Sequence, residues 1–268
     1  MAQGAASPGT RKITSLALLR CTNRPERKAL KLGFGRVAGL DEAGRGCLFG
    51  PVYAGAVILN PDRPIRGLRD SKQLAPERRQ ELAEKIRASA LAWAVAWADN
   101  TEIDRLNIYQ ASRLAMRRAL DGLSPSPDYL LVDALRLDTT IAQKALIHGD
   151  ALSRSIAAAS ILAKVARDES MLDWDRLYPQ YGFLHHKGYG TPEHLHALAE
   201  HGVTPHHRFS FEPVSRQMAV PATETPGQQL PPATTPGQAP SCGLSIKNEA
   251  AGGSGQLSLF EEAAAAWT

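Results

Sequence analysis

Two adjacent acidic residues, Asp41 and Glu42, lie between the apolar segments 37–40 and 52–59 and lead directly into Gly44-Arg45-Gly46. An acidic pair is most often a solvated turn, but the apolar flanks indicate a buried strand, where carboxylates without a cation are costly. The glycines allow positive φ and a close approach of the main chain to a ligand. A guanidinium is well suited to bind phosphate. The pattern therefore predicts metal-assisted chemistry on a phosphodiester.

The composition is ordinary for a globular protein, with 43% hydrophobic and 22% charged residues in 268. This length suffices for one large domain or two small ones. The three cysteines, Cys21, Cys47 and Cys242, form no CxxC pair. Their spacing excludes a disulfide scaffold and a thiolate zinc site, and favours the reducing cytoplasm. No apolar run is long enough to span a bilayer.

The net charge of +4 is unevenly distributed along the chain. Residues 1–33 hold seven Lys or Arg and one Glu, whereas residues 219–268 hold one Lys and four Glu. The middle is nearly neutral, so a nucleic-acid-binding surface there must be a local patch. Residues 1–33 lack regular periodicity, and we interpret them as a basic disordered extension. An over-called start codon and an organelle transit peptide are the alternatives.

The order of the predicted elements indicates an α/β fold, a mixed sheet flanked by helices with a helical C-terminal part. A run of small residues at 157–160 predicts close packing of one helix on the sheet, and Thr101 to Asp104 resembles a capping box. Strands are expected at 36–41, 52–59, 91–98, 128–133 and 144–148, and helices at 76–88, 101–120, 153–174 and 192–200.

Three of the predicted strands end in acid, at Asp41-Glu42, Asp133 and Asp150. Ligands bind beyond the carboxyl ends of strands in open α/β sheets, so these four carboxylates should meet there. Hard oxygen ligands favour Mg²⁺ or Mn²⁺, and two ions roughly 3.5–4 Å apart would assist an in-line phosphoryl displacement. Neighbours on a regular strand point to opposite faces, so we expect the strand to end or twist at the turn 43–46. Taken singly, Asp133 and Asp150 could be a helix cap or a surface acid.

Several motifs in this order, spread over about 36–216, resemble the ribonuclease HII family of bacteria. They are the 38–46 segment (AGLDEAGRG) with Gly50-Pro51-Val52, Asp70-Ser71-Lys72, Leu131-Val132-Asp133, Gly149-Asp150, the 155–168 segment (SIAAASILAKVARD), Lys187-Gly188-Tyr189-Gly190-Thr191 and His207-Arg208-Phe209-Ser210-Phe211. Two positions depart from the family pattern. Cys47 stands where proline is commoner, and Ala134 stands where glycine is usual.

The resemblance implies a ribonuclease H-like fold and endonucleolytic hydrolysis of the RNA strand of RNA–DNA hybrids, leaving 5′-phosphates. It also implies incision 5′ to single ribonucleotides in duplex DNA, a step of ribonucleotide excision repair. The metal-binding acids would be Asp41, Glu42, Asp133 and Asp150. Gly44, Arg45 and Gly46 would read the 2′-hydroxyl, largely through the main chain, and Tyr189 would stack on the sugar beyond it. The 2′-hydroxyl is what distinguishes RNA from DNA at one site.

Other polar residues have less specific interpretations. Lys72 and Lys164 are candidate phosphate contacts, and either could equally be an ordinary surface lysine. The histidines at 185–186, 194, 196 and 206–207 could form a zinc site, but no HExxH or cysteine partner is present. We therefore expect them to be surface or substrate-side residues.

The C-terminal part divides into three segments beyond a globular domain at 34–217. Pro, Thr, Gln, Gly and Ala dominate the linker 218–255, a composition that cannot bury a core. Apolar anchors then return at 256–260, followed by a tail at 261–268. A short anchor on a tether is typical of a groove-binding peptide. The peptide resembles the one by which bacterial replication and repair proteins bind the sliding clamp; its residues are Gln256, Leu257, Ser258, Leu259 and Phe260.

The sequence thus predicts a cytoplasmic, monomeric, Mg²⁺- or Mn²⁺-dependent endoribonuclease with a clamp-binding tail. One alternative is another two-metal nuclease, such as a 3′–5′ exonuclease, against which the Gly-Arg-Gly element and Tyr189 argue. The other is a non-catalytic module that binds a clamp and nucleic acid, against which four retained acids argue.

Overall fold

The computed structural model describes residues 20–219 and 245–246, and its centre is a mixed sheet in the order β5-β4-β1-β2-β3-β6. The central strand β1 runs antiparallel to β2 and parallel to β4. The pairs β2–β3 and β3–β6 are antiparallel, and β4–β5 is parallel. The strands are β1 (Val37–Ala43), β2 (Val52–Ile58), β3 (Ala92–Ala98), β4 (Tyr129–Asp133), β5 (Ala142–Leu146) and β6 (Ser245–Ile246).

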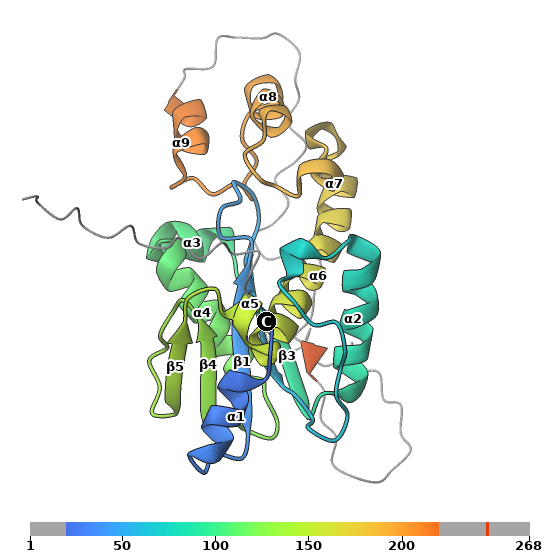
Figure 1. The fold of residues 1–268 in the computed structure, drawn as a ribbon. Coiled ribbons are helices and arrows are strands. Elements are labelled where there is room, and N and C mark those ends of the chain that lie inside the picture. Colours follow the sequence, from blue (N-terminus) through green and yellow to red (C-terminus); the bar gives the residue numbers. More distant parts are fainter. Residues whose placement is uncertain (1–19, 220–244, 247–268) are drawn as a thin grey trace, which may run out of the picture.

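Helices cover both faces of the sheet and form a second small core at one end. One face packs on α3 and α4, and the other on α2 and α6. The C-terminal half of α6 packs with α7, α8 and α9, which Figure 1 shows grouped beyond the end of β1. The helices are α1 (Arg24–Lys31), α2 (Pro76–Ser89), α3 (Asn100–Leu106), α4 (Ile108–Asp121), α5 (Gly149–Leu152), α6 (Arg154–Leu177), α7 (Phe183–His186), α8 (Pro192–His201) and α9 (Glu212–Ala219), with 3₁₀ turns η2 (Ser71–Gln73) and η3 (Pro179–Tyr181). The predicted fold class is confirmed.

Close packing of α6 on the sheet depends on two glycines. A Cβ on Gly39 would lie 2.1 Å from the carbonyl carbon of Ser155, and one on Gly55 would lie 2.3 Å from the carbonyl oxygen of Ala159. The small residues of α6 therefore touch the strand backbones directly, which confirms the predicted packing. This contact fixes the position of α6 along β1, and so relative to Asp41 and Glu42.

Two predicted elements need correction. The strand expected at 144–148 ends at Leu146, because His148 adopts a positive φ of 56° and caps α5. The helix expected at 101–120 is two helices, since Asn107 has a φ of 69° and starts α4. Its capping box is also two residues earlier than predicted, formed by Asp99 and Glu102.

The N-terminal region was expected to be irregular up to residue 33, but residues 24–31 form α1. Glu26 of this helix accepts hydrogen bonds from the hydroxyl of Ser153 at 2.6 Å and from the amide and hydroxyl of Ser155, both at 2.8 Å. These donors belong to the start of α6, where a carboxylate also interacts favourably with the helix dipole. Residues 20–31 are therefore part of the folded unit. Among the residues described, no helix is long and apolar enough to cross a membrane.

Candidate active site

Four acidic residues come together where β1 and β4 run side by side. Leu40 pairs with Val132, so Asp41 and Asp133 are the next residues along the two parallel strands. The amide of Gly149 donates a hydrogen bond of 2.6 Å to Asp133, which brings Asp150 in α5 beside them. Asp150 thus lies in the first turn of a helix, and not at the end of a strand as predicted.

From the sequence, β1 was expected to end or twist at the turn 43–46, and the strand does end at Ala43, beyond both acids. Both residues stay paired with β2, opposite Gly55 and Ala54, and the strand continues to Ala43. The side chain of Asp41 is buried and accepts a hydrogen bond from Ser160 of α6, whereas Glu42 binds the guanidinium of Arg45 at 3.2 Å. The charge of Asp133 raises the pKa of both acids, so Asp41 and Glu42 reach the same cluster although both lie within the strand.

The cluster holds more negative charge than its surroundings neutralise. Burial raises the pKa of Asp41 well above its usual value, and the charges of Glu42 and Asp133 raise it further. Burial also raises the pKa of Glu42, against the opposing effect of Arg45. Burial also raises the pKa values of Asp133 and Asp150, and the charge of Asp70 raises the pKa of Asp150 further. Such a group of carboxylates is stabilised by an added cation.

The donor chemistry of the cluster fits a divalent metal ion. All four side chains offer hard oxygen atoms, and Oε2 of Glu42 is buried without a hydrogen-bond partner among the described residues. Within residues 20–219, however, no three Asp, Glu, His or Cys side chains are already arranged to hold one ion. Arg45 and Lys72 instead bind two of the carboxylates. The four acids therefore lie close together and offer suitable ligand atoms, but they are not prearranged to hold a metal ion.

The two candidate lysines have different surroundings. The ammonium of Lys72 in η2 lies 3.6 Å from Asp150, on a side chain that is 81% exposed. Burial lowers the pKa of Lys72, but Asp150 and Asp70 raise it more, so it stays charged. Lys164 on α6 binds Asp168, and burial lowers its pKa. The structure brings Lys72 to the acids, but none of the contacts of Lys164 involves them.

The two glycines of the Gly44-Arg45-Gly46 loop have different roles. Gly44 has a φ of 90°, and a Cβ there would lie 2.2 Å from Nε of Arg167. Around Gly46, a Cβ would meet nothing within 4 Å. Gly44 is therefore required by the protein interior, and the open approach to the main chain that the sequence predicted exists at Gly46.

Arg208 stabilises this loop from the protein interior, a role that the sequence did not reveal. Its fully buried guanidinium donates hydrogen bonds to four main-chain carbonyls, those of Gly44 and Arg45 at 2.8 Å, Gly50 at 2.9 Å and Pro51 at 3.1 Å. Burial lowers the pKa of Arg208 to about 10, which leaves it charged at neutral pH. The only signal in the sequence was its place in the motif at 207–211.

Tyr189 lies beside the same loop. It forms an antiparallel bridge with the buried Cys47, and its ring is 40% exposed. The fully buried Arg167 places its guanidinium 5.5 Å from the centre of that ring and donates to the carbonyl of Lys187 at 2.6 Å. The structure thus joins the acids, the Gly-Arg-Gly loop and Tyr189 through the pair Glu42–Arg45 and the bridge at Cys47.

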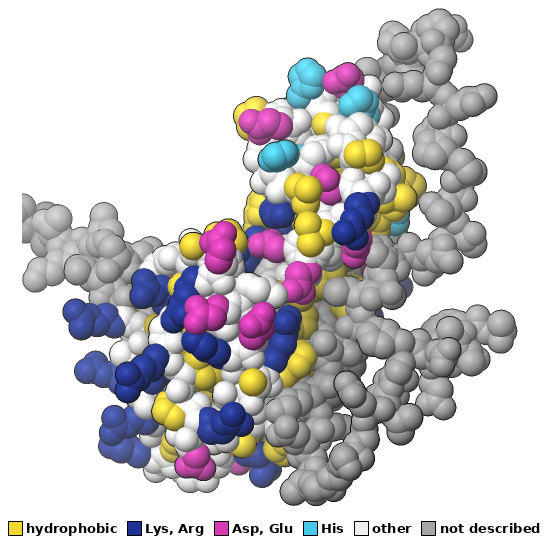
Figure 2. Space-filling model, turned by 90° about the vertical axis from the view of Figure 1, so that its right-hand side faces the viewer, with side chains coloured by type: hydrophobic (Ala, Val, Ile, Leu, Met, Phe, Trp, Pro, Cys, Tyr) yellow, Lys and Arg dark blue, Asp and Glu magenta, His cyan; other side chains and the backbone are white. Residues whose placement is uncertain are grey.

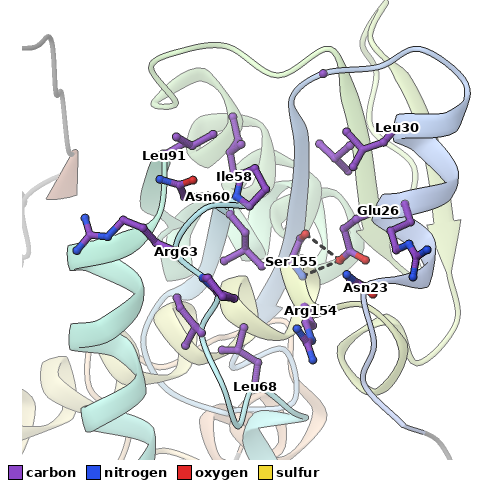
Figure 3. A pocket seen from close by; sticks show the side chains of 17 residues that line it. Asn23, Glu26, Leu30, Ile58, Asn60, Arg63, Leu68, Leu91, Arg154 and Ser155 are labelled. Atoms are coloured by element: carbon purple, nitrogen blue, oxygen red, sulfur yellow. Dashed lines mark hydrogen bonds between the residues drawn. The ribbon is translucent and has the colours of Figure 1, made fainter.

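Two further features, a basic surface patch and a cavity, bear on where the site lies. Figure 2 shows lysine and arginine side chains gathered on the lower part of one face, which agrees with a local basic patch. A cavity of about 240 Å³ lies elsewhere, at the opposite end of β1, lined by Val37, Ile58 and the start of α6. Figure 3 shows there the carboxylate of Glu26 turned to Ser155. None of the four acids lines that cavity.

The fold and the acidic cluster place this chain among the nucleases with a ribonuclease H-like fold. The family model for ribonuclease HII matches residues 38–214. A ribonuclease HII from Solibacter usitatus is 58% identical over 204 residues, which cover 76% of this chain and 90% of the relative.

Solved structures agree with this result. A ribonuclease H2 from Pyrococcus horikoshii superposes with a TM-score of 0.60 at 26% identity, over 68% of this chain and 97% of the other. A PCNA:RNase HII complex from Archaeoglobus fulgidus gives a TM-score of 0.58, also at 26% identity, over 68% and 96%. The chain belongs to the ribonuclease HII family. It is an endoribonuclease with ribonuclease H activity on RNA–DNA hybrids.

Proposed function

We propose that this enzyme also incises duplex DNA on the 5′ side of single embedded ribonucleotides, leaving 5′-phosphate ends, by two-metal-ion catalysis. The observation that carries the proposal is the cluster of four acids with raised pKa values beside an open glycine loop and an exposed tyrosine. Carboxylates supply the metal site, and a main chain within reach of the 2′-hydroxyl supplies the selectivity.

The proposed metal ligands are Asp41, Glu42, Asp133 and Asp150, which would hold Mg²⁺ or Mn²⁺. Two such ions polarise the scissile phosphate and lower the pKa of the attacking water. Arg45 and Lys72 neutralise the acids while no metal is bound, and their release from Glu42 and Asp150 would free both cations for the substrate phosphates. The buried, unpartnered Oε2 of Glu42 supports this assignment.

The proposed substrate contacts lie along the surface that joins the acids to Tyr189. The main chain at Gly46 and Arg45 would meet the 2′-hydroxyl, with Gly44 required for the shape of the loop. Tyr189 would stack on the next sugar. Lys72 is close enough to the acids to bind a phosphate there. Lys164 would first have to leave Asp168.

Incision of a labelled duplex that contains one ribonucleotide tests the function. We expect a single cut 5′ to the ribonucleotide in Mg²⁺ or Mn²⁺ and no cut in chelator, whereas an all-DNA duplex should stay intact. Stepwise shortening from a 3′ end would instead indicate an exonuclease. Binding of the duplex without any cut would indicate a non-catalytic module.

We propose a domain division to go with this function. The catalytic unit extends from about residue 20, and not from 34, to about 217, followed by a linker at 218–255 of which residues 245–246 pair with β3. The peptide at 256–260 lies outside the described residues, and we propose that it binds a bacterial sliding clamp. The archaeal relative solved with PCNA supports an association with a clamp. The scattered cysteines fit a reducing compartment, and we propose that the enzyme acts in the cytoplasm as a monomer.

A pull-down with purified sliding clamp tests the tail. Deletion of residues 256–260 should abolish clamp binding and leave cleavage of a short duplex unchanged. Deletion of the neighbouring residues 263–267 is the matched control and should retain binding. Clamp binding by the first deletion variant would exclude this peptide as the anchor.

A further inference from the structure

Three histidines that the sequence analysis placed at the surface are buried. His194 and His207 are fully buried, and His186 is 8% exposed. His194 belongs to α8, and His207 follows Thr204 in the segment that also carries Arg208. No cluster of metal-binding side chains exists among the described residues, so the zinc alternative receives no support there. A different role is needed for polar rings in an apolar core.

Their hydrogen bonds have a fixed direction. The amide of Thr204 donates to Nδ1 of His207 at 3.0 Å, so the proton of that ring is on Nε2. This Nε2 lies 3.2 Å from Nε2 of His194, which must accept. The proton of His194 is then on Nδ1, which donates to the carbonyl of Tyr189 at 2.9 Å. Nδ1 of His207 also accepts from the hydroxyl of Thr204 at 2.9 Å, so every ring nitrogen of the pair has a partner.

The order of protons requires that both rings stay neutral. Burial lowers the pKa of His194 to about 4 and the pKa of His207 to about 3. A second proton on Nε2 of His194 would leave two N–H groups facing each other across 3.2 Å, and a second proton on Nδ1 of His207 would face the amide of Thr204 across 3.0 Å. The pair therefore remains intact at the neutral pH at which the enzyme works.

The histidine pair ends on the loop that carries Tyr189. Lys187 and Gly188 both have positive φ, 51° and 75°, so α7 ends here and the chain enters an irregular loop. Nδ1 of His186 accepts from the amide of Gly188 at 3.1 Å, and His194 donates to the carbonyl of Tyr189. These two contacts add to the bonds that the loop receives from Arg167 and from the amide of Leu48. The other end of the pair adjoins Arg208, which holds the carbonyls of Gly44 and Arg45. One segment thus supports both parts of the proposed substrate surface.

We propose that His194 and His207 are positioning residues, a hydrogen-bonded pair that sets the main chain of Tyr189 relative to the Gly44–Gly46 loop and so determines selectivity for a ribonucleotide within DNA. This inference rests on the proposed function of Tyr189. The pair touches neither the acids nor the surface. Its effect is expected in the choice between substrates more than in the chemistry itself.

The first experiment compares incision at one embedded ribonucleotide with cleavage of a long RNA–DNA hybrid. The ratio of the two kcat/KM values should fall about tenfold in His194→Leu, as expected when a contacting group is slightly misplaced. His194→Gln, whose amide can donate to Tyr189 and accept from His207, should recover most of the ratio. His196→Leu, on the same helix with an 80% exposed side chain, is the matched control and should not change it.

A double variant separates positioning from simple loss of structure. If His194 acts through Tyr189, His194→Leu should have no further effect on the ratio in a Tyr189→Ala background. Equal losses on both substrates in His194→Leu would overturn the proposal. If Tyr189→Ala lowers the ratio and His194→Leu does not, the inference fails while the function proposed for Tyr189 stands. If Tyr189→Ala itself has no effect, both fail.

A measurement on the unchanged full-length enzyme avoids the risk that a variant does not fold. ¹⁵N NMR of the histidine rings at pH 7 should show a proton on Nδ1 of His194 and on Nε2 of His207, with both rings neutral down to about pH 5. The opposite tautomers, or titration of either ring near pH 6.5, would overturn the proposed pair.

Discussion

The charge of Asp41 is expected to favour metal binding and catalysis but to destabilise the metal-free fold. Its raised pKa means that the charged form is unfavourable in the metal-free fold. We expect Asp41→Asn to lower kcat by about a thousandfold, since metal ions contribute several kcal/mol to transition-state stabilisation. The same change should raise the melting temperature of the metal-free enzyme and reduce its further rise in Mg²⁺. Thermal melts with and without Mg²⁺, beside a cleavage assay, check both effects, and full turnover by the variant would refute the metal role.

Ala134 is a second single-residue case. It has a φ of 48°, a left-handed conformation that glycine adopts without steric cost, and it directly follows Asp133. Ala134→Gly should therefore stabilise the fold by about 0.5–1 kcal/mol, with little change in cleavage. Urea unfolding measures this difference. Ala145→Gly, in β5 where the backbone is extended, is the control and should destabilise the protein instead.

At the scale of single residues, the sequence could predict charged residues that lie among apolar neighbours. Asp41 and Glu42 are conspicuous because apolar strands flank them. Arg167 and Arg208 are equally buried, but their partners are carbonyl oxygens of distant loops, which carry no signal in the side-chain pattern. Long-range contacts with the main chain must be seen in three dimensions.

At the scale of elements, strands were easier to predict than the short helices that join them. The strands β1 to β4 have apolar patterns and were predicted close to their observed bounds. The mostly exposed β5 was misplaced by two residues, and β6 was not predicted. The helix α1 was missed because it is short and basic, with Ala29 as its one buried residue. Its stability comes from tertiary contacts with the start of α6, which periodicity cannot reveal.

The contact of α1 with α6 supplies a prediction. Glu26→Ala removes the acceptor of three hydrogen bonds and should cost about 1–3 kcal/mol in unfolding free energy. This corresponds to a fall of several degrees in melting temperature. The kcat should stay nearly unchanged, because the substitution alters none of the four acids of the candidate site. Lys28→Ala, on the exposed face of the same helix, is the control. A melting temperature equal to that of the unchanged enzyme would show that α1 does not support the fold.

At the scale of the whole molecule, two buried sets of groups titrate in opposite senses. His194 and His207 have pKa values of about 4 and about 3, below the 6.5 of an unfolded histidine. As the pH falls below 6.5, the unfolded chain binds more protons, so stability falls by up to about 1.4 kcal/mol per pH unit for each ring. Asp41, with a raised pKa, binds its proton first in the folded state and offsets part of this loss.

This opposition predicts the pH dependence of metal-free stability. Without Asp41 the offset is absent, so the unfolding free energy of Asp41→Asn should fall more steeply between pH 7 and pH 5 than that of the unchanged enzyme. Urea unfolding at several pH values in chelator measures both slopes. His196→Leu removes an exposed histidine and should leave the slope unchanged. Parallel slopes for Asp41→Asn and the unchanged enzyme would show that Asp41 is already ionised throughout this range, and that the acidic end of the sheet holds its charge without a metal.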